Sequence, residues 1–129
     1  MLAAAICWFI ITVVLLTLPG SALPSENWMQ KIWFDKWAHI GVFGLLVLLW
    51  CYYFKLAGPQ GKLVSICLIV TVLGIILGTA MEFVQKYWIP NRSFDLGDIA
   101  ADAIGSIMAF GWSYKRFIKK RKQYYSHDH

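Results

Sequence analysis

The sequence predicts an all-α fold: a four-helix transmembrane bundle with a short interfacial segment before the second helix. Of its 129 residues, 59% are hydrophobic and only 15% are charged, whereas ordinary soluble domains carry about 25% charged residues. Four apolar segments approach the about 20 residues that a helix needs to cross a bilayer. Helices satisfy their own backbone hydrogen bonds in lipid, so we expect one membrane domain over residues 1–129.

The four expected membrane helices are the apolar segments of the chain, at residues 2–18, 37–54, 63–84 and 99–118. The first ends at Pro19-Gly20 and is the shortest. A cleaved signal peptide is the alternative for this segment, but it lacks a basic start and its apolar run is long for that role. We therefore expect a retained helix.

The interfacial segment is expected at residues 25–34. Trp28, Ile32 and Trp33 would lie on one side of a short helix, with polar residues on the other. A helix of this kind lies in the headgroup region of a membrane. A plain loop fits the same residues equally well.

The positive charges predict the orientation in the membrane. Eight of the twelve Lys and Arg residues lie in the loop at 55–62 and in the basic tail at 115–129. Cytoplasmic loops are rich in Lys and Arg, so both termini are expected in the cytoplasm. The tail also accounts for the net charge of +5, and a basic run beside an apolar segment favours membrane contact over nucleic-acid binding.

Small residues recur at four-residue spacing on two of the expected helices. Gly74 and Gly78 form a GxxxG pattern, and Ala101, Gly105 and Ala109 form a second stripe. Small residues let helix backbones approach closely in a membrane. These faces predict tight packing of the helices, and they could also support an oligomer.

Three ionisable groups lie about one helical turn inside the apolar segments: His39, Glu82 and Asp102. Such groups are costly in lipid unless they are paired, and they usually have a function. They come from three different helices near the same expected membrane face, so we expect them to meet in one polar pocket on the extracytoplasmic side.

The residue types around this pocket indicate acid–base chemistry and anion binding. His39 would act as a general acid or base, with Asp35 four residues earlier on the same helical side to orient it. Glu82 would be the second acid or base, in contact with Asp102. These three, His39, Asp35 and Glu82, are the candidate catalytic residues.

The candidate ligand-binding residues flank the same motifs: Lys36, Gln85, Arg92, Asp98 and Asp102. Lys36 and Arg92 suit a phosphate group. Asp98 is expected to cap the fourth helix at its N-terminus.

No cofactor or dedicated metal motif is predicted, although paired carboxylates could hold a divalent ion together with a phosphate. The three cysteines, at positions 7, 51 and 67, lie in apolar runs without metal-ligand spacing, and we interpret them as packing residues. Ser93, beside Arg92, is a weak candidate for a nucleophile.

The ordered set of motifs resembles the VanZ-like family of small bacterial membrane proteins. It comprises Asp35-Lys36-x-x-His39, Glu82-x-x-Gln85, Arg92 and Asp98-x-x-x-Asp102-x-x-Gly105. The resemblance covers about residues 35–105 and implies a four-helix membrane fold in the cytoplasmic (inner) membrane of a bacterium. It also implies a connection with resistance to teicoplanin, a glycopeptide antibiotic with a lipid tail. Asp102 departs from the pattern, in which Asn is more usual.

Three functions fit these residues. The first is binding of a lipid-linked envelope ligand that bears phosphate or glycan, with a possible contribution to teicoplanin resistance. The second is a membrane enzyme that modifies a phospholipid or a polyprenyl-linked glycan through His39 and Glu82. The third is a structural or assembly subunit in which the polar groups only staple the helices together.

Overall fold

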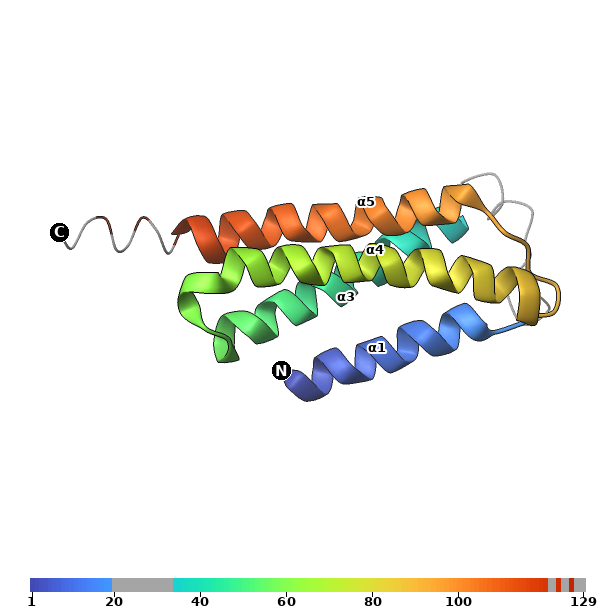
Figure 1. The fold of residues 1–129 in the computed structure, drawn as a ribbon, viewed down its shortest axis with the longest axis horizontal. Helices are drawn as coiled ribbons and strands as arrows, with labels where there is room; N and C mark the ends of the chain where they lie inside the picture. Colours follow the sequence, from blue (N-terminus) through green and yellow to red (C-terminus); the bar gives the residue numbers. More distant parts are fainter. Residues whose placement is uncertain (20–33, 121–122, 124–125, 127–129) are drawn as a thin grey trace.

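The protein is all-helical in the computed structural model, which describes residues 1–19, 34–120, 123 and 126 and has no strand in those ranges. Its elements are α1 (Leu2–Thr17), α3 (Phe34–Ala57), the short turn η2 (Gln60–Lys62), α4 (Leu63–Trp88), α5 (Leu96–Ser113) and the π-helical turn η3 (Tyr114–Lys119). Figure 1 shows α1, α3, α4 and α5 running side by side along the long axis of the molecule. The interfacial segment expected at 25–34 lies outside the described residues, except that Phe34 begins α3.

The four helices occur where the apolar segments predict them, but several ends differ. α3 begins at Phe34 and α4 continues to Trp88, because polar residues at the helix ends still adopt helical backbone. α5 begins at Leu96, and its regular part ends at Ser113 before the π-helical turn. An apolar segment marks the part of a helix suited to lipid, so its length underestimates the length of a helix whose ends are polar.

Small residues bring α3 and α5 into close contact. A β-carbon built on Gly44 would lie 3.3 Å from the carbonyl oxygen of Gly105, and one built on Gly105 would collide with the backbone of Ile40. On α4, Gly74 packs against Val47 and Ser106 in the same way. The small-residue faces are thus used between helices of one chain.

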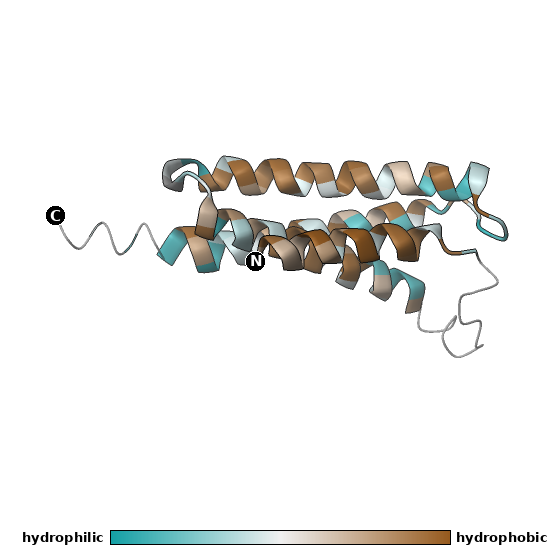
Figure 2. Cartoon of the chain, turned by 90° about the horizontal axis from the view of Figure 1, so that it is seen from below, coloured by the Kyte–Doolittle hydropathy of each residue, from teal (hydrophilic) through white to brown (hydrophobic). Residues whose placement is uncertain are grey.

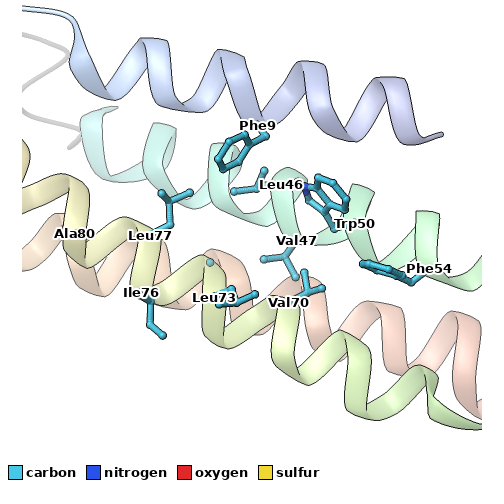
Figure 3. A pocket seen from close by; sticks show the side chains of 11 residues that line it. Phe9, Leu46, Val47, Trp50, Phe54, Val70, Leu73, Ile76, Leu77 and Ala80 are labelled. Carbon is cyan, nitrogen blue, oxygen red and sulfur yellow. The ribbon is translucent and has the colours of Figure 1, made fainter. Parts of the chain in front are cut away.

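An apolar groove of about 570 Å³ lies between α1, α3 and α4. Figure 3 shows Phe9 of α1 above one side of it, with the side chains of α3 and α4 around the rest. The lining residues are Phe9, Leu46, Val47, Trp50, Phe54, Val70, Leu73, Gly74, Ile76, Leu77 and Ala80. None of them is ionisable, so this groove offers no acid–base chemistry.

The sides of the bundle are apolar and exposed. Large hydrophobic side chains such as Ile10, Ile69 and Met108 are more than half exposed, and Figure 2 shows hydrophobic colour along the helices with hydrophilic colour gathered toward their ends. Within the described residues, α3 and α4 are long and apolar enough to cross a membrane, while α1 is apolar but has only 16 residues. Together these features suggest a membrane protein.

Candidate functional site

Ionisable residues gather at the end of the bundle where α3 and α5 begin and α4 ends (Figure 1). We call this group the polar cluster. Its members are Asp35, Lys36, His39, Glu82, Asp95, Asp98 and Asp102. Residues from three helices that are widely separated in sequence therefore meet, as the positions of His39, Glu82 and Asp102 predicted.

His39 is held by Asp102. Its Nδ1 lies 2.7 Å from Asp102 Oδ1, and the two residues are 7% and 1% exposed. The opposite ring nitrogen, Nε2, lies 3.6 Å from Asp98 Oδ2. With Asp102 ionised, its carboxylate can only accept, so Nδ1 carries the proton and the ring orientation is fixed.

Asp35 does not take the role expected for it. Its side chain is 61% exposed and pairs with Lys36 at 2.9 Å, so Asp102 rather than Asp35 orients His39. The close approach of α3 and α5 explains the difference, because it places a carboxylate of the neighbouring helix against the imidazole. The i,i+4 spacing alone does not reveal contacts between helices.

The space for Asp102 comes from Gly78. A β-carbon at position 78 would collide with the Asp102 carboxylate and would lie 2.8 Å from its β-carbon. Asp102 Oδ2 is fully buried and has no hydrogen-bond partner among the described residues. The GxxxG pattern of α4 thus accommodates a polar side chain as well as a close helix contact.

Lys36 is surrounded by carboxylates. Its Nζ donates to Asp35 Oδ2 at 2.9 Å, Asp98 Oδ1 at 2.7 Å and Asp95 Oδ2 at 2.5 Å. The ammonium lowers the pKa of Asp95 below its ordinary value, chiefly through this hydrogen bond. A lysine with three carboxylate partners has little capacity left for the phosphate that the sequence analysis assigned to it.

Asp95 caps α5. Its Oδ1 accepts from the backbone N–H of Gly97 at 2.8 Å, so the expectation that Asp98 is the N-cap is wrong by one turn. Asp98 lies in the first turn instead and binds Lys36. Asp95 is a functional residue for which the sequence suggested no role. An Asp immediately before a helix that has a second acidic residue in its first turn is the signal that would have identified it.

Glu82 connects the end of α4 to the start of α5. It is 1% exposed, and its Oε2 accepts from the backbone N–H of Asp95 at 3.1 Å. This bond to the backbone of Asp95 is a partner that the sequence did not suggest. Glu82 still lies beside the His39 imidazole. One ring nitrogen of His39 and one carboxylate oxygen each of Glu82 and Asp98 lie within 4.8 Å of one another.

Gln85 and Arg92 bind the end of α1 rather than the polar cluster. Gln85 Nε2 donates to the carbonyl of Leu16 at 2.9 Å, and Arg92 donates to the carbonyls of Leu15 and Leu18 at 3.2 and 3.0 Å. The last carbonyls of a helix lack intrahelical partners and attract cations and amide donors. The donors of these two residues are thus directed to carbonyls of α1, whereas the sequence suggested a bound ligand as their partner.

Two groups of side chains have the composition of metal ligands: His39, Glu82 and Asp98, and separately Asp35, Asp95 and Asp98. The second group already surrounds the Lys36 ammonium. Among the described residues, Lys36 contacts Asp98 of the first group but neither His39 nor Glu82. Ser93 lies on the α4–α5 connection and is exposed.

No protein-family model, curated protein or solved structure matches this chain.

Proposed function

We propose that this chain is an integral protein of a bacterial cytoplasmic membrane, with four spanning helices and both termini in the cytoplasm. The exposed apolar sides of α3 and α4 support this, because soluble monomers rarely expose large contiguous apolar surfaces. The basic residues after α5 would then lie at the cytoplasmic surface, and the polar cluster would lie at the opposite, outer face.

We further propose that the polar cluster binds the headgroup of a lipid-linked envelope component. The observation that carries this proposal is the burial of His39, Glu82 and Asp102 together at one end of an otherwise apolar bundle. An ionisable side chain at that depth in a membrane raises the free energy of the folded protein by several kcal/mol, unless a partner or ligand pairs with it. In the proposed orientation the cluster would lie near the outer membrane surface, where headgroups lie.

The charge of the cluster favours a headgroup rich in hydroxyl or amine donors. Carboxylates accept hydrogen bonds from such groups, as a glycan provides. A phosphate would need an additional cation, since Lys36 is occupied by carboxylates and Arg92 binds α1. The glycan part of a lipid-linked precursor is therefore the ligand portion that the described contacts fit best.

The resemblance of the motifs to the VanZ-like family points the same way. It extends the proposal to a contribution to teicoplanin resistance, in which the protein shields or sequesters a lipid-linked envelope component. Resistance of cells that express the chain, compared with cells that express the Glu82→Gln variant, would measure this contribution.

The binding proposal can be tested with protein in lipid nanodiscs that contain a polyprenyl-linked glycan. We expect retention of the glycan lipid by the wild type and by Asp35→Asn, whose carboxylate lies at the exposed edge, and a loss of retention by His39→Ala and Glu82→Gln. Undiminished retention by both cluster variants, with lowered thermal stability, would show that the cluster is only a structural staple.

A membrane enzyme is the second candidate, and the Asp102–His39 pair favours it. Asp102 fixes Nδ1 and leaves Nε2 facing the acidic side of the cluster, as a general base or acid requires. A phospholipid or a polyprenyl-linked glycan would be the substrate. Incubation of the wild type with radiolabelled lipid should then give a product that His39→Ala does not form, and intact substrate after long incubation would exclude this candidate.

A further inference from the structure

We infer that His39, Glu82 and Asp98 form a binding site for a divalent metal ion. The three side chains come from α3, α4 and α5, all are buried, and each places one donor atom within 4.8 Å of the other two. This inference does not depend on the identity of the lipid ligand, because it uses only contacts within the chain.

The inner part of the cluster brings hydrogen-bond acceptors together. When the His39 ring is neutral and Nδ1 donates to Asp102, Nε2 is an acceptor. It faces Asp98 Oδ2 at 3.6 Å, which is also an acceptor. The Glu82 carboxylate adds a third acceptor to the same space. Acceptors brought together in a buried place need a proton or a metal ion between them, and a metal ion at Nε2 would take the place of the proton that an imidazolium would donate to Asp98.

The His39 imidazole is held on its other side by the carboxylate of Asp102. Histidines that bind metals usually donate the other ring N–H to a carboxylate, which fixes the ring and raises its basicity. Asp102 does this at 2.7 Å and is itself 1% exposed. The neighbouring donors leave the metal-facing oxygens available: Lys36 binds the other oxygen of Asp98.

The polar cluster has more carboxylates than cationic groups. Five carboxylates of the polar cluster face one ammonium and one imidazole, and Arg92 is directed to α1. The carboxylates belong to Asp35, Glu82, Asp95, Asp98 and Asp102. Lys36 balances the outer part of this charge, at Asp35 and Asp95. A divalent ion at His39, Glu82 and Asp98 would balance the inner part.

The ligand set indicates the class of ion. One imidazole nitrogen with two carboxylate oxygens suits Zn²⁺ or Mn²⁺ better than Mg²⁺ or Ca²⁺, which prefer oxygen ligands alone. Ligand atoms around Zn²⁺ stand about 3.3 Å apart, so small side-chain movements from the present spacing would complete the site. Three protein ligands also leave a position open for water or for a ligand oxygen.

The test is a Zn²⁺ titration of the full chain in detergent, followed by isothermal titration calorimetry. A chelator first removes any bound metal from the protein. The protein carries no histidine tag, and His127 and His129 of the tail are replaced by alanine so that they cannot contribute. We expect one saturable site per chain. Affinity should fall by at least about tenfold in Glu82→Gln and in Asp98→Asn, whereas Asp35→Asn should bind as the wild type does.

A second measurement needs no substitution in the site and therefore covers the case in which those variants fail to fold. In ¹⁵N-histidine-labelled protein, Zn²⁺ should shift the Nε2 resonance of His39 and leave its Nδ1 protonated. Absence of saturable binding, or an unshifted His39 signal while Zn²⁺ binds, would overturn the inference. An equal loss of affinity in Asp35→Asn would do the same, because it would mean nonspecific attraction to acidic residues.

Discussion

The carboxylate of Asp102 occupies the space beside Gly78 that a side chain would otherwise fill. This contact couples the backbone of α4 to the residue that holds His39. The glycine pattern of α4 and the polar cluster are therefore one structural unit.

A methyl group at position 78 should disturb this unit. We expect Gly78→Ala to lower the free energy of unfolding by about 1–3 kcal/mol, because the added atom overpacks against a buried and constrained carboxylate. Thermal unfolding in detergent measures the change. Gly41→Ala is the matched control on α3, where an added β-carbon meets no atom within 4 Å. It should leave stability unchanged or raise it by up to about 1 kcal/mol, and equal effects of the two substitutions would contradict the packing described for Asp102.

Arg92 should contribute to the stability of α1 and not to ligand affinity. Arg92→Ala removes two donors from the carbonyls of Leu15 and Leu18, so we expect a loss of about 1–3 kcal/mol. Arg116→Ala, at an exposed arginine of the tail region, controls for the loss of charge. A fall in glycan-lipid retention by Arg92→Ala without a fall in melting temperature would return Arg92 to the binding site.

The partner of His39 can be identified by double-mutant cycles. The pair His39→Ala and Asp102→Ala should show a coupling of about 0.5–3 kcal/mol, as expected for residues in direct contact. The pair His39→Ala and Asp35→Ala should be additive, because Asp35 is directed to Lys36. Asp102→Asn should keep part of the coupling, since an amide oxygen can still accept from Nδ1.

Asp95 should stabilise the start of α5 in two separable ways. Asp95→Asn keeps an oxygen for the cap on Gly97 but loses the ion pair with Lys36, whereas Asp95→Ala loses both. Asp95→Ala should therefore lower the melting temperature more than Asp95→Asn does. The difference between their free energies of unfolding should be about 1 kcal/mol. An asparagine variant as unstable as the alanine variant would show that the cap contributes nothing.

The pH dependence of the same substitution follows from the lowered pKa of Asp95. A carboxyl group with a depressed pKa in the folded state contributes stability above its unfolded pKa and loses it as pH falls through the folded value. The difference in melting temperature between the wild type and Asp95→Asn should thus be constant at neutral pH and shrink below about pH 4, the ordinary range for Asp. A difference that does not change with pH would show that the charge of Asp95 has no part in it.

The orientation in the membrane can be tested with cysteines in a background that lacks Cys7, Cys51 and Cys67. Ser93→Cys, on the exposed α4–α5 connection, should react with an impermeant maleimide added outside spheroplasts. Gly61→Cys, in the α3–α4 turn, should react only after the membrane is opened. The reverse pattern would place the polar cluster at the cytoplasmic face.

Sequence reasoning predicted the helices and the meeting of their ionisable groups better than it predicted the individual pairs. Hydrophobic length locates a helix, and the shared depth of His39, Glu82 and Asp102 places them at one end of the bundle. Partners such as Asp102 for His39 depend on how two helices cross, which local spacing does not contain.

The contacts of Arg92 and Gln85 with α1 could not be predicted for a related reason. Their polar side chains suggested a ligand, but the nearest unsatisfied groups belong to the end of α1, more than 60 residues earlier in the chain. The sequence does not reveal which side chain will donate to the unpaired carbonyls at the end of a helix, because that depends on contacts between distant segments.

That connection has a consequence for biosynthesis. The carbonyl of Leu16 emerges from the ribosome 69 residues before Gln85, its donor. Until α4 and the connection after it are translated, the carbonyls at the far end of the first helix lack these donors, although Trp8 can already donate to the carbonyl of Val42 in α3. Fixing this end should therefore be a late step of assembly, and a nascent chain that is arrested before Gln85 should hold the far end of the first helix only loosely.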